Sequence, residues 1–126
     1  MREFQKRKDN MMIGGVSTAK LAQRFGTPLM VTDENALREN YRAIYEAFNA
    51  VFPTRVNYAC KANTNLALLR VLEQEGSCID AVSIGEVESC LKAGFSPDRI
   101  LYTGVSVSDE EMRLLVEKKV PINVDS

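Results

Sequence analysis

The stretch Val56–Ala62, VNYACKA, opens the part of the sequence that decides the fold. Further strand-like runs begin at Ile79, Ile100 and Ile122, so successive starts are 23, 21 and 22 residues apart. Helix-like segments lie between them: NLALLRVLEQE, GEVESCLKA and DEEMRLLVEKK. Strands that alternate with helices at this spacing predict βαβ units, and hence a parallel sheet covered by helices.

Two architectures use this alternation: an open doubly wound sheet and a (β/α)₈ barrel, which typically needs about 250 residues. Four strand-like runs cannot close a barrel of eight. The chain has 126 residues and stops at Ser126, at the end of a strand, where a loop and a helix should follow. We therefore expect the front part of a larger α/β protein.

The segment before the first strand is less regular. Residues 1–12 are polar and charged, and we expect them to form an irregular terminus. Ser17 is predicted to cap a short helix that ends at Gly26. Leu29–Thr32 is typical of a short strand, and Asp33 is predicted to cap a longer helix with apolar residues at helical spacing.

Composition excludes several kinds of chemistry. The sequence has no histidine, and its 16 Lys and Arg residues balance 17 Asp and Glu residues. A Ser-His-Asp triad, a Cys-His pair, a histidine-ligated zinc and an imidazole base are thus excluded. The balanced charge gives no basic surface for nucleic acid or an anionic membrane. Proton chemistry falls to lysine, carboxylates, tyrosine or cysteine.

The three cysteines, Cys60, Cys78 and Cys90, form no CxxC pair and no even disulfide framework. We interpret them as reduced thiols of a cytoplasmic protein, with Cys60 a small core residue that faces the helices. The first 15 residues lack the apolar core of a signal peptide, and no apolar run approaches the roughly 20 residues of a membrane span.

Lys61 is the strongest candidate for chemistry. Alternation along the strand places Asn57, Ala59 and Lys61 on one face, and Lys61 falls at the carboxyl end, where parallel α/β folds place their active sites. A desolvated amine there could form a Schiff base with an aldehyde. The alternative is a lysine whose stem lies along apolar surface while its ammonium stays in water.

Two carboxylates follow. Asp80 falls within the second strand, where a carboxylate is costly unless it is paired. It could meet Lys61 across neighbouring strands, or it could accept hydrogen bonds from backbone or hydroxyl groups. Glu86 lies three residues after Ser83, which is capping-box spacing, so it could serve the site, cap its helix, or do both. The same spacing of Ser108 and Glu111 predicts a capping box for the last helix.

The order of these motifs resembles a known family. The sequence lacks GxGxxG and P-loop patterns. It carries YACKAN at 58–63, DAVSIGE at 80–86 and ILYTG at 100–104. Over residues 13–126 it resembles the pyridoxal-phosphate decarboxylases with an alanine-racemase-like barrel. Ile79 and Ile84 depart mildly from the pattern of many relatives.

The resemblance implies an α/β fold, the N-terminal part of a pyridoxal-phosphate-binding (β/α)₈ TIM barrel with about four barrel strands. Residues 1–32 would be an N-terminal segment and strand that pack with a C-terminal β domain, and residues 33–126 the first half of the barrel. It also implies that Lys61 holds pyridoxal 5'-phosphate as a Schiff base, with Asp80 and Glu86 as cofactor-binding residues and no metal.

The implied reaction is decarboxylation of meso-2,6-diaminopimelate to L-lysine. Ornithine/arginine-type or carboxynorspermidine decarboxylation in the same family is the alternative. The expected partner is a small amino-acid substrate, with no nucleic acid and no membrane, and the full-length protein is expected to be a homodimer. The family's cofactor-stacking imidazole and glycine-rich phosphate loop would lie beyond Ser126, so we expect the chain alone to be inactive. An alternative from another functional class is a non-catalytic α/β binding module, with Lys61 as a surface lysine.

Overall fold

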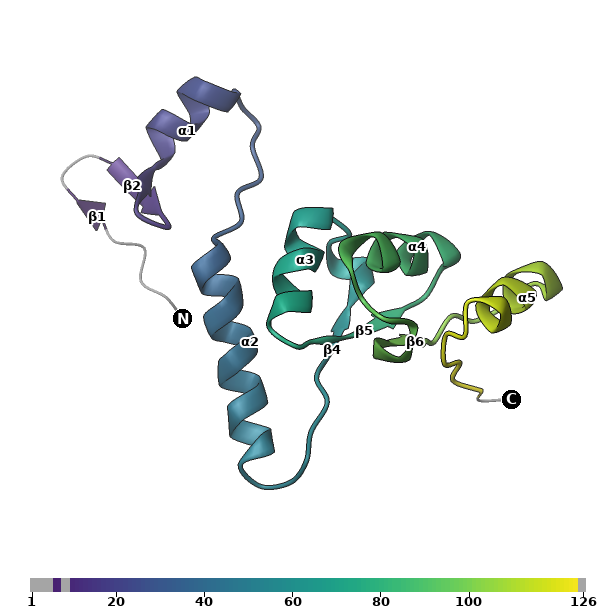
Figure 1. Cartoon of the computed structure of the whole chain (residues 1–126). Coiled ribbons are helices and arrows are strands. Elements are labelled where there is room, and N and C mark those ends of the chain that lie inside the picture. Colours follow the sequence, from purple (N-terminus) through teal and green to yellow (C-terminus); the bar gives the residue numbers. More distant parts are fainter. Residues whose placement is uncertain (1–5, 8–9, 125–126) are drawn as a thin grey trace. The chain divides into compact units, whose positions relative to one another are not determined.

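The computed structural model describes residues 6–7 and 10–124 (Figure 1). The chain divides into two compact units, Met1–Glu39 and Asn40–Ser126, and the division falls inside a helix. The second unit contains the repeat of strands and helices that begins at Val56.

The first unit begins with a small antiparallel sheet. Its strands, in the order β1-β2-β3, are Lys6–Arg7, Asn10–Ile13 and Val16–Ser17. Gly14 and Gly15, with φ of 55° and 78°, form the two-residue turn between β2 and β3, a turn that requires positive φ. The expected irregular terminus is thus wrong for residues 6–7 and 10–12, because the glycine pair lets this polar segment form a hairpin; residues 1–5 and 8–9 lie outside the described residues.

Helix α1, Thr18–Phe25, confirms the predicted short helix, which ends at Gly26 with φ of 80°. Ser17 occupies the N-cap position, although its side chain makes no capping hydrogen bond. The predicted strand at Leu29–Thr32 is wrong. This segment pairs with no described strand, and Met30 is 98% exposed, so the backbone lacks the ladder that a strand needs.

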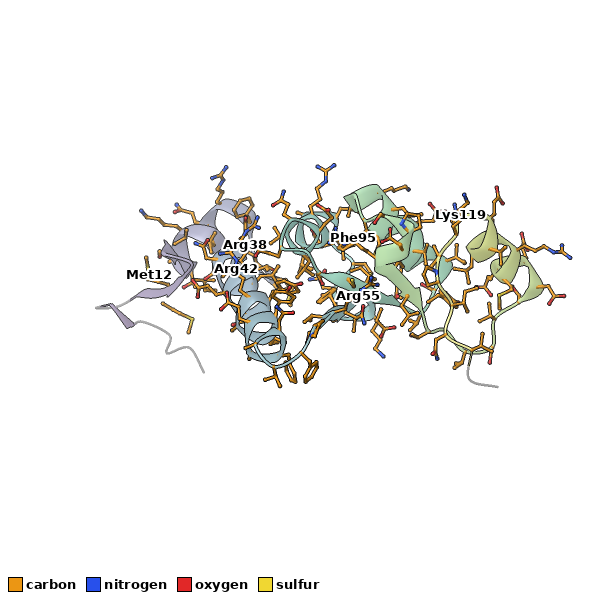
Figure 2. All side chains as sticks on the ribbon, turned by 60° about the horizontal axis from the view of Figure 1, so that its bottom comes forward. Met12, Arg38, Arg42, Arg55, Phe95 and Lys119 are labelled. Carbon is orange, nitrogen blue, oxygen red and sulfur yellow. The ribbon has the colours of Figure 1, made fainter. Side chains whose placement is uncertain are left out.

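Helix α2, Glu34–Asn49, confirms the predicted longer helix. The Asp33 carboxylate accepts a hydrogen bond from the Ala36 backbone N–H at 3.2 Å, as expected for a cap. Farther along, in the second unit, Arg42, which is labelled in Figure 2, forms an ion pair with Glu75 at the end of the next helix. Tyr41 is buried and stacks on Tyr45, with 6.2 Å between the ring centroids.

The second unit contains the predicted parallel sheet. Its strands, in spatial order, are β4 (Asn57–Ala59), β5 (Cys78–Ala81) and β6 (Ile100–Tyr102). A single parallel bridge joins Tyr102 to Ile122, which marks the fourth predicted strand; Asp125 and Ser126 lie outside the described residues. The connecting helices are α3 (Leu66–Gln74), α4 (Ile84–Ala93) and α5 (Asp109–Glu117), with 3₁₀ turns η1 (Cys60–Ala62) and η2 (Pro97–Arg99).

The two faces of the sheet differ in burial. Tyr58, Ile79 and Ile100 are in register, and the two isoleucines are 0% and 1% exposed. Helix α4 contacts β5 and β6, and α3 packs against α4; the buried residues of these two helices include Leu69, Leu72 and Val87. The opposite face, with Ala59, Asp80 and Leu101 in register, is only partly covered. The core of this unit therefore lies between the sheet and its helices.

Arg99 stabilises the loop between α3 and β5 through hydrogen bonds. Its guanidinium donates to the Ser77 carbonyl at 2.5 Å and to the Glu73 carboxylate at 3.0 Å. The same group lies over the ring of the buried Phe95, the residue labelled in Figure 2, and 5.0 Å separates the guanidinium carbon from the ring centroid. None of the helices in the described part of the chain is long and apolar enough to cross a membrane.

Candidate functional site

Lys61 lies at the carboxyl edge of the parallel sheet, as predicted, but not on a strand. Strand β4 ends at Ala59, and the backbone then enters η1, which the Asn63 N–H closes by donating to the Cys60 carbonyl at 3.1 Å. The alternation of faces predicted through Lys61 therefore stops at Cys60. The Lys61 side chain is exposed rather than desolvated in the described chain.

Polar side chains brace the turn that carries Lys61. The Tyr58 hydroxyl donates to the Asn63 carbonyl at 3.3 Å, and the Asn63 side chain accepts from the Asn65 backbone N–H at 2.9 Å. The Asn65 side chain in turn accepts from the Ala67 N–H and caps α3. Asn63 and Asn65 thus connect η1 to the next helix, and together with Tyr58 they hold the backbone on both sides of Lys61.

Asp80 lies on the neighbouring strand, in register with Ala59. Its Oδ1 atom accepts a hydrogen bond from the Thr103 hydroxyl at 2.5 Å, and within the described residues it forms no ion pair with Lys61. Of the two alternatives for Asp80, the hydroxyl contact is the one observed. Sequence reasoning missed Thr103, although it falls two residues after Leu101, which pairs with Asp80 and therefore shares its face.

Glu86 lies in the first turn of α4 and serves that helix. Its carboxylate accepts from the Val82 backbone N–H at 2.7 Å, while the Ser83 hydroxyl accepts from the Glu86 N–H at 3.3 Å. The capping alternative is thus observed, with the carboxylate bound one residue ahead of the position that a standard capping box uses. By contrast, Ser108 and Glu111 form the complete capping box predicted for α5.

Cys60 is buried, as predicted, and so are Cys78 and Cys90; all three are free thiols. Cys60, next to Lys61, points to the helix side of the sheet, where its sulfur lies 3.6 Å from that of Cys90 on α4. Burial raises the pKa of both thiols, and the contact with Cys60 raises the pKa of Cys90 further. A thiol that resists ionisation is a poor nucleophile, so these residues support the site by packing.

A close contact shapes the third strand end. The Tyr102 side chain is 2% exposed and folds back over Gly104, so that a Cβ atom at Gly104 would lie 2.5 Å from the Tyr102 hydroxyl oxygen. Burial raises the pKa of Tyr102. A side chain at position 104 would therefore displace the buried Tyr102 ring or the backbone that leaves β6, a constraint that the sequence pattern did not reveal.

The side chains at this edge include an amine and a carboxylate. No group of three or more Cys, Asp and Glu side chains in the described residues could hold a metal ion. An exposed amine at Lys61 is available for a Schiff base. A carboxylate at Asp80 stands on the adjacent strand, with its second oxygen free of hydrogen bonds to described residues.

Comparison with known proteins identifies the family. Residues 16–126 match the pyridoxal binding domain of the pyridoxal-dependent decarboxylases. The chain belongs to this family. The match includes Lys61, Asp80 and Glu86, and it extends over β4 to β6 and their helices.

Relatives within the pyridoxal-dependent decarboxylases are close. Diaminopimelate decarboxylase of Methanothermobacter thermautotrophicus is 55% identical over 120 residues, which are 94% of this chain and 28% of that protein. The crystal structure of diaminopimelate decarboxylase from M. jannaschii matches with a TM-score of 0.91 at 33% identity, covering 97% of this chain and 30% of that one. The same enzyme in co-complex with L-lysine matches with a TM-score of 0.88 at 34% identity, over 96% of this chain and 30% of that one.

These matches confirm the predicted fold as the N-terminal part of the pyridoxal-phosphate-binding barrel. The chain spans less than a third of the length of the relatives it matches.

Proposed function

We propose that this chain is the N-terminal part of a pyridoxal-phosphate-dependent carboxy-lyase that converts meso-2,6-diaminopimelate into L-lysine and CO₂. The observation that carries the proposal is the place of Lys61: an exposed amine on a braced turn at the carboxyl edge of a parallel sheet, within a family of pyridoxal-dependent decarboxylases. The most similar relatives named above are diaminopimelate decarboxylases, and one of their structures holds L-lysine, the product of the proposed reaction.

The residues of this chain divide the work by position. Lys61 would supply the amine that binds the cofactor aldehyde. The bound cofactor would accept the electron pair of the carbon–carbon bond that breaks when CO₂ leaves. Asp80 offers an anionic oxygen beside the strand that leads to Lys61, where it can orient a protonated amine. Glu86 holds the backbone at the start of α4, which begins at the same edge of the sheet.

Further features of the whole protein belong to the same proposal. Residues 1–32 would pack with a C-terminal β domain, and residues 33–126 would form the first half of the barrel. The full-length protein would act as a cytoplasmic homodimer. Size-exclusion chromatography with light scattering on the full-length protein measures the oligomeric state, and a monomer would contradict the homodimer.

The test uses the full-length protein that contains this chain. Adding pyridoxal phosphate should give an absorbance band near the visible edge, and diaminopimelate should then be converted into CO₂ and L-lysine, detected by mass spectrometry. Lys61→Ala should abolish both the band and turnover. Lys92→Ala, which removes a lysine from the last turn of α4, is the matched control and should retain both. A band and turnover that survive Lys61→Ala would refute the proposal.

A further inference from the structure

The hydrogen bond between Thr103 and Asp80 joins two strands at the edge that carries Lys61. Asp80 pairs with Leu101 across the ladder, and Thr103 is the next residue on the same face. The Thr103 backbone N–H donates to the Ala81 carbonyl at 2.8 Å, which extends the ladder beyond β6. Both ends of the side-chain contact therefore stand on paired backbone.

The Thr103 hydroxyl is well placed to hold the Asp80 carboxylate. The Thr103 hydroxyl donates to Asp80 Oδ1, and a hydrogen bond from a hydroxyl to a carboxylate is stronger than one between two neutral groups. Threonine is branched at Cβ and has restricted χ1, so its hydroxyl is held in place by the backbone. Its bond to Oδ1 restrains the orientation of the Asp80 carboxylate.

The second oxygen of Asp80 remains open. Within the described residues Asp80 Oδ2 accepts no hydrogen bond, and Asp80 is only partly buried. A carboxylate oxygen can only accept, so its complement is an N–H or O–H donor, and a cationic amine is the strongest. Two such amines belong at this edge under the proposed function: that of Lys61 and that of an amino-acid substrate.

We propose that Thr103 is a positioning residue, which holds Asp80 by Oδ1 so that Oδ2 faces the reacting amine. This inference rests on the proposed function, and it assigns Thr103 a role in turnover that acts through Asp80. Loss of the hydroxyl would let the carboxylate rotate, so the reacting amine would be oriented less often while substrate binding elsewhere would persist.

The experiment is a double-mutant cycle in the full-length protein with pyridoxal phosphate bound. Thr103→Val removes the hydroxyl and keeps the branched shape, whereas Thr103→Ser keeps the hydroxyl. Asp80→Asn and the Asp80→Asn, Thr103→Val double variant complete the cycle. Thr54→Val is the matched control, because the Thr54 hydroxyl donates to the Phe52 carbonyl before β4, at the other end of the strand. The readouts are kcat, KM, and the dissociation constant of pyridoxal phosphate from the visible band.

Thr103→Val should lower kcat about tenfold, which matches the loss of one hydrogen bond to a charged group, with KM changed by less than about twofold. Thr103→Ser should recover kcat to within about threefold of the wild type, and Thr54→Val should equal it. In the Asp80→Asn background, Thr103→Val should change neither kcat nor the dissociation constant further, because its partner is already altered.

Three outcomes would overturn the inference alone while Lys61 still governs the visible band. These are wild-type kcat in Thr103→Val, an equal defect in Thr103→Ser, and losses from Thr103→Val and Asp80→Asn that multiply. If the wild-type protein shows no band dependent on Lys61, the proposed function itself fails and the inference fails with it. Thr103→Ser also serves as the informative variant if Thr103→Val does not fold.

Discussion

Lys61 is held at the edge of the sheet by a 3₁₀ turn, and this turn separates its amine from the packed face beneath the helices. Its neighbour Cys60 anchors the turn by placing its sulfur against Cys90, where both side chains are 0% exposed. One residue therefore anchors the turn, and the next carries the exposed amine. A substitution at either position should affect a different property: packing for Cys60 and cofactor attachment for Lys61.

The buried thiols should make stability fall at alkaline pH. Burial raises the pKa of Cys60 and of Cys90, so the unfolded chain releases these protons at a lower pH than the folded one. Their stabilising contribution is present below about pH 8.5, the ordinary thiol pKa, and declines as pH rises above it. Urea unfolding between pH 7 and pH 10 measures this. Cys90→Ala should show a shallower decline than the wild type, and an equal slope would contradict the prediction.

A larger residue at position 104 should destabilise the protein. A Cβ at this position would lie 2.5 Å from the Tyr102 hydroxyl oxygen, so Gly104→Ala must displace a buried ring or the loop after β6. We expect a loss of about 1–3 kcal/mol in the free energy of unfolding, measured by urea titration. Gly85→Ala is the control, because no atom lies within 4 Å of an added Cβ there and alanine favours a helix. Equal stability of the two variants would contradict the prediction.

The positions of the candidate site residues could be predicted from the sequence, but their side-chain contacts could not. The positions of Lys61, Asp80 and Glu86 relative to strand ends and helix starts follow from periodicity and capping spacing. The contact of Thr103 with Asp80 depends on the register between strands, and the approach of Tyr102 to Gly104 depends on a side-chain rotamer. Neither property is encoded in local spacing, so both contacts required the three-dimensional structure.

At the scale of elements, the helices begin where short polar side chains can accept hydrogen bonds from their first N–H groups. Asn65, Ser83 and Ser108 each accept such a bond at the start of α3, α4 and α5. Those three helices follow the three strands whose ends form the candidate site. Caps therefore also fix where the loops at this edge end.

The capping box of α5 should make stability depend on acid pH. The Ser108 backbone N–H and hydroxyl lower the pKa of Glu111, so its contribution is present above the unfolded pKa of about 4.3 and is lost as pH falls through the folded value. Glu111→Gln should therefore destabilise the protein at pH 7, and its difference from the wild type should shrink towards pH 3. Thermal unfolding across this range provides the measurement.

Glu110→Gln provides the control for that experiment. Glu110 lies in the same first turn of α5 and feels the same helix dipole, but the capping box does not include it. The Glu110→Gln variant should therefore show a smaller drop in melting temperature at pH 7 than the Glu111→Gln variant. If the two variants behave alike, the helix dipole alone accounts for the effect and the capping box contributes nothing measurable.

The elements that sequence reasoning found share strong local signals. Polar caps, Gly26 and apolar periodicity mark α1 and α2, and the strand repeat marks β4 to β6. The prediction for Leu29–Thr32 failed because β-propensity describes how a segment fits a sheet, and this segment has no paired neighbour among the described residues. The hairpin at Gly14–Gly15 was missed because its strands are short and polar.

At the scale of the whole molecule, the sheet has one face packed beneath helices and one face partly open, and the open face leads to the candidate site. Closing a barrel would place further strands beside Ile122 and cover that open face. The predicted repeat of strand and helix set this architecture correctly, since its period is long enough for a crossover helix.

Residues 1–126 alone should not turn over diaminopimelate. Lys61 can bind an aldehyde, but its side chain is exposed to water, and the family's stacking imidazole and glycine-rich phosphate loop are expected beyond Ser126. Incubation of the isolated chain with pyridoxal phosphate and diaminopimelate, followed by mass spectrometry for L-lysine, tests this. Product that forms with the wild type and disappears in Lys61→Ala would contradict the prediction.

The neighbour-to-neighbour order of β4, β5 and β6 has a consequence for synthesis on the ribosome. Each strand pairs with the next one along the chain, so a nascent polypeptide could complete each pairing soon after the second strand leaves the exit tunnel. The outer layer of helices would be secured first, and the face that leads to Lys61 would wait for later strands. Assembly in this order would leave the exposed amine of Lys61 accessible until the later strands pair.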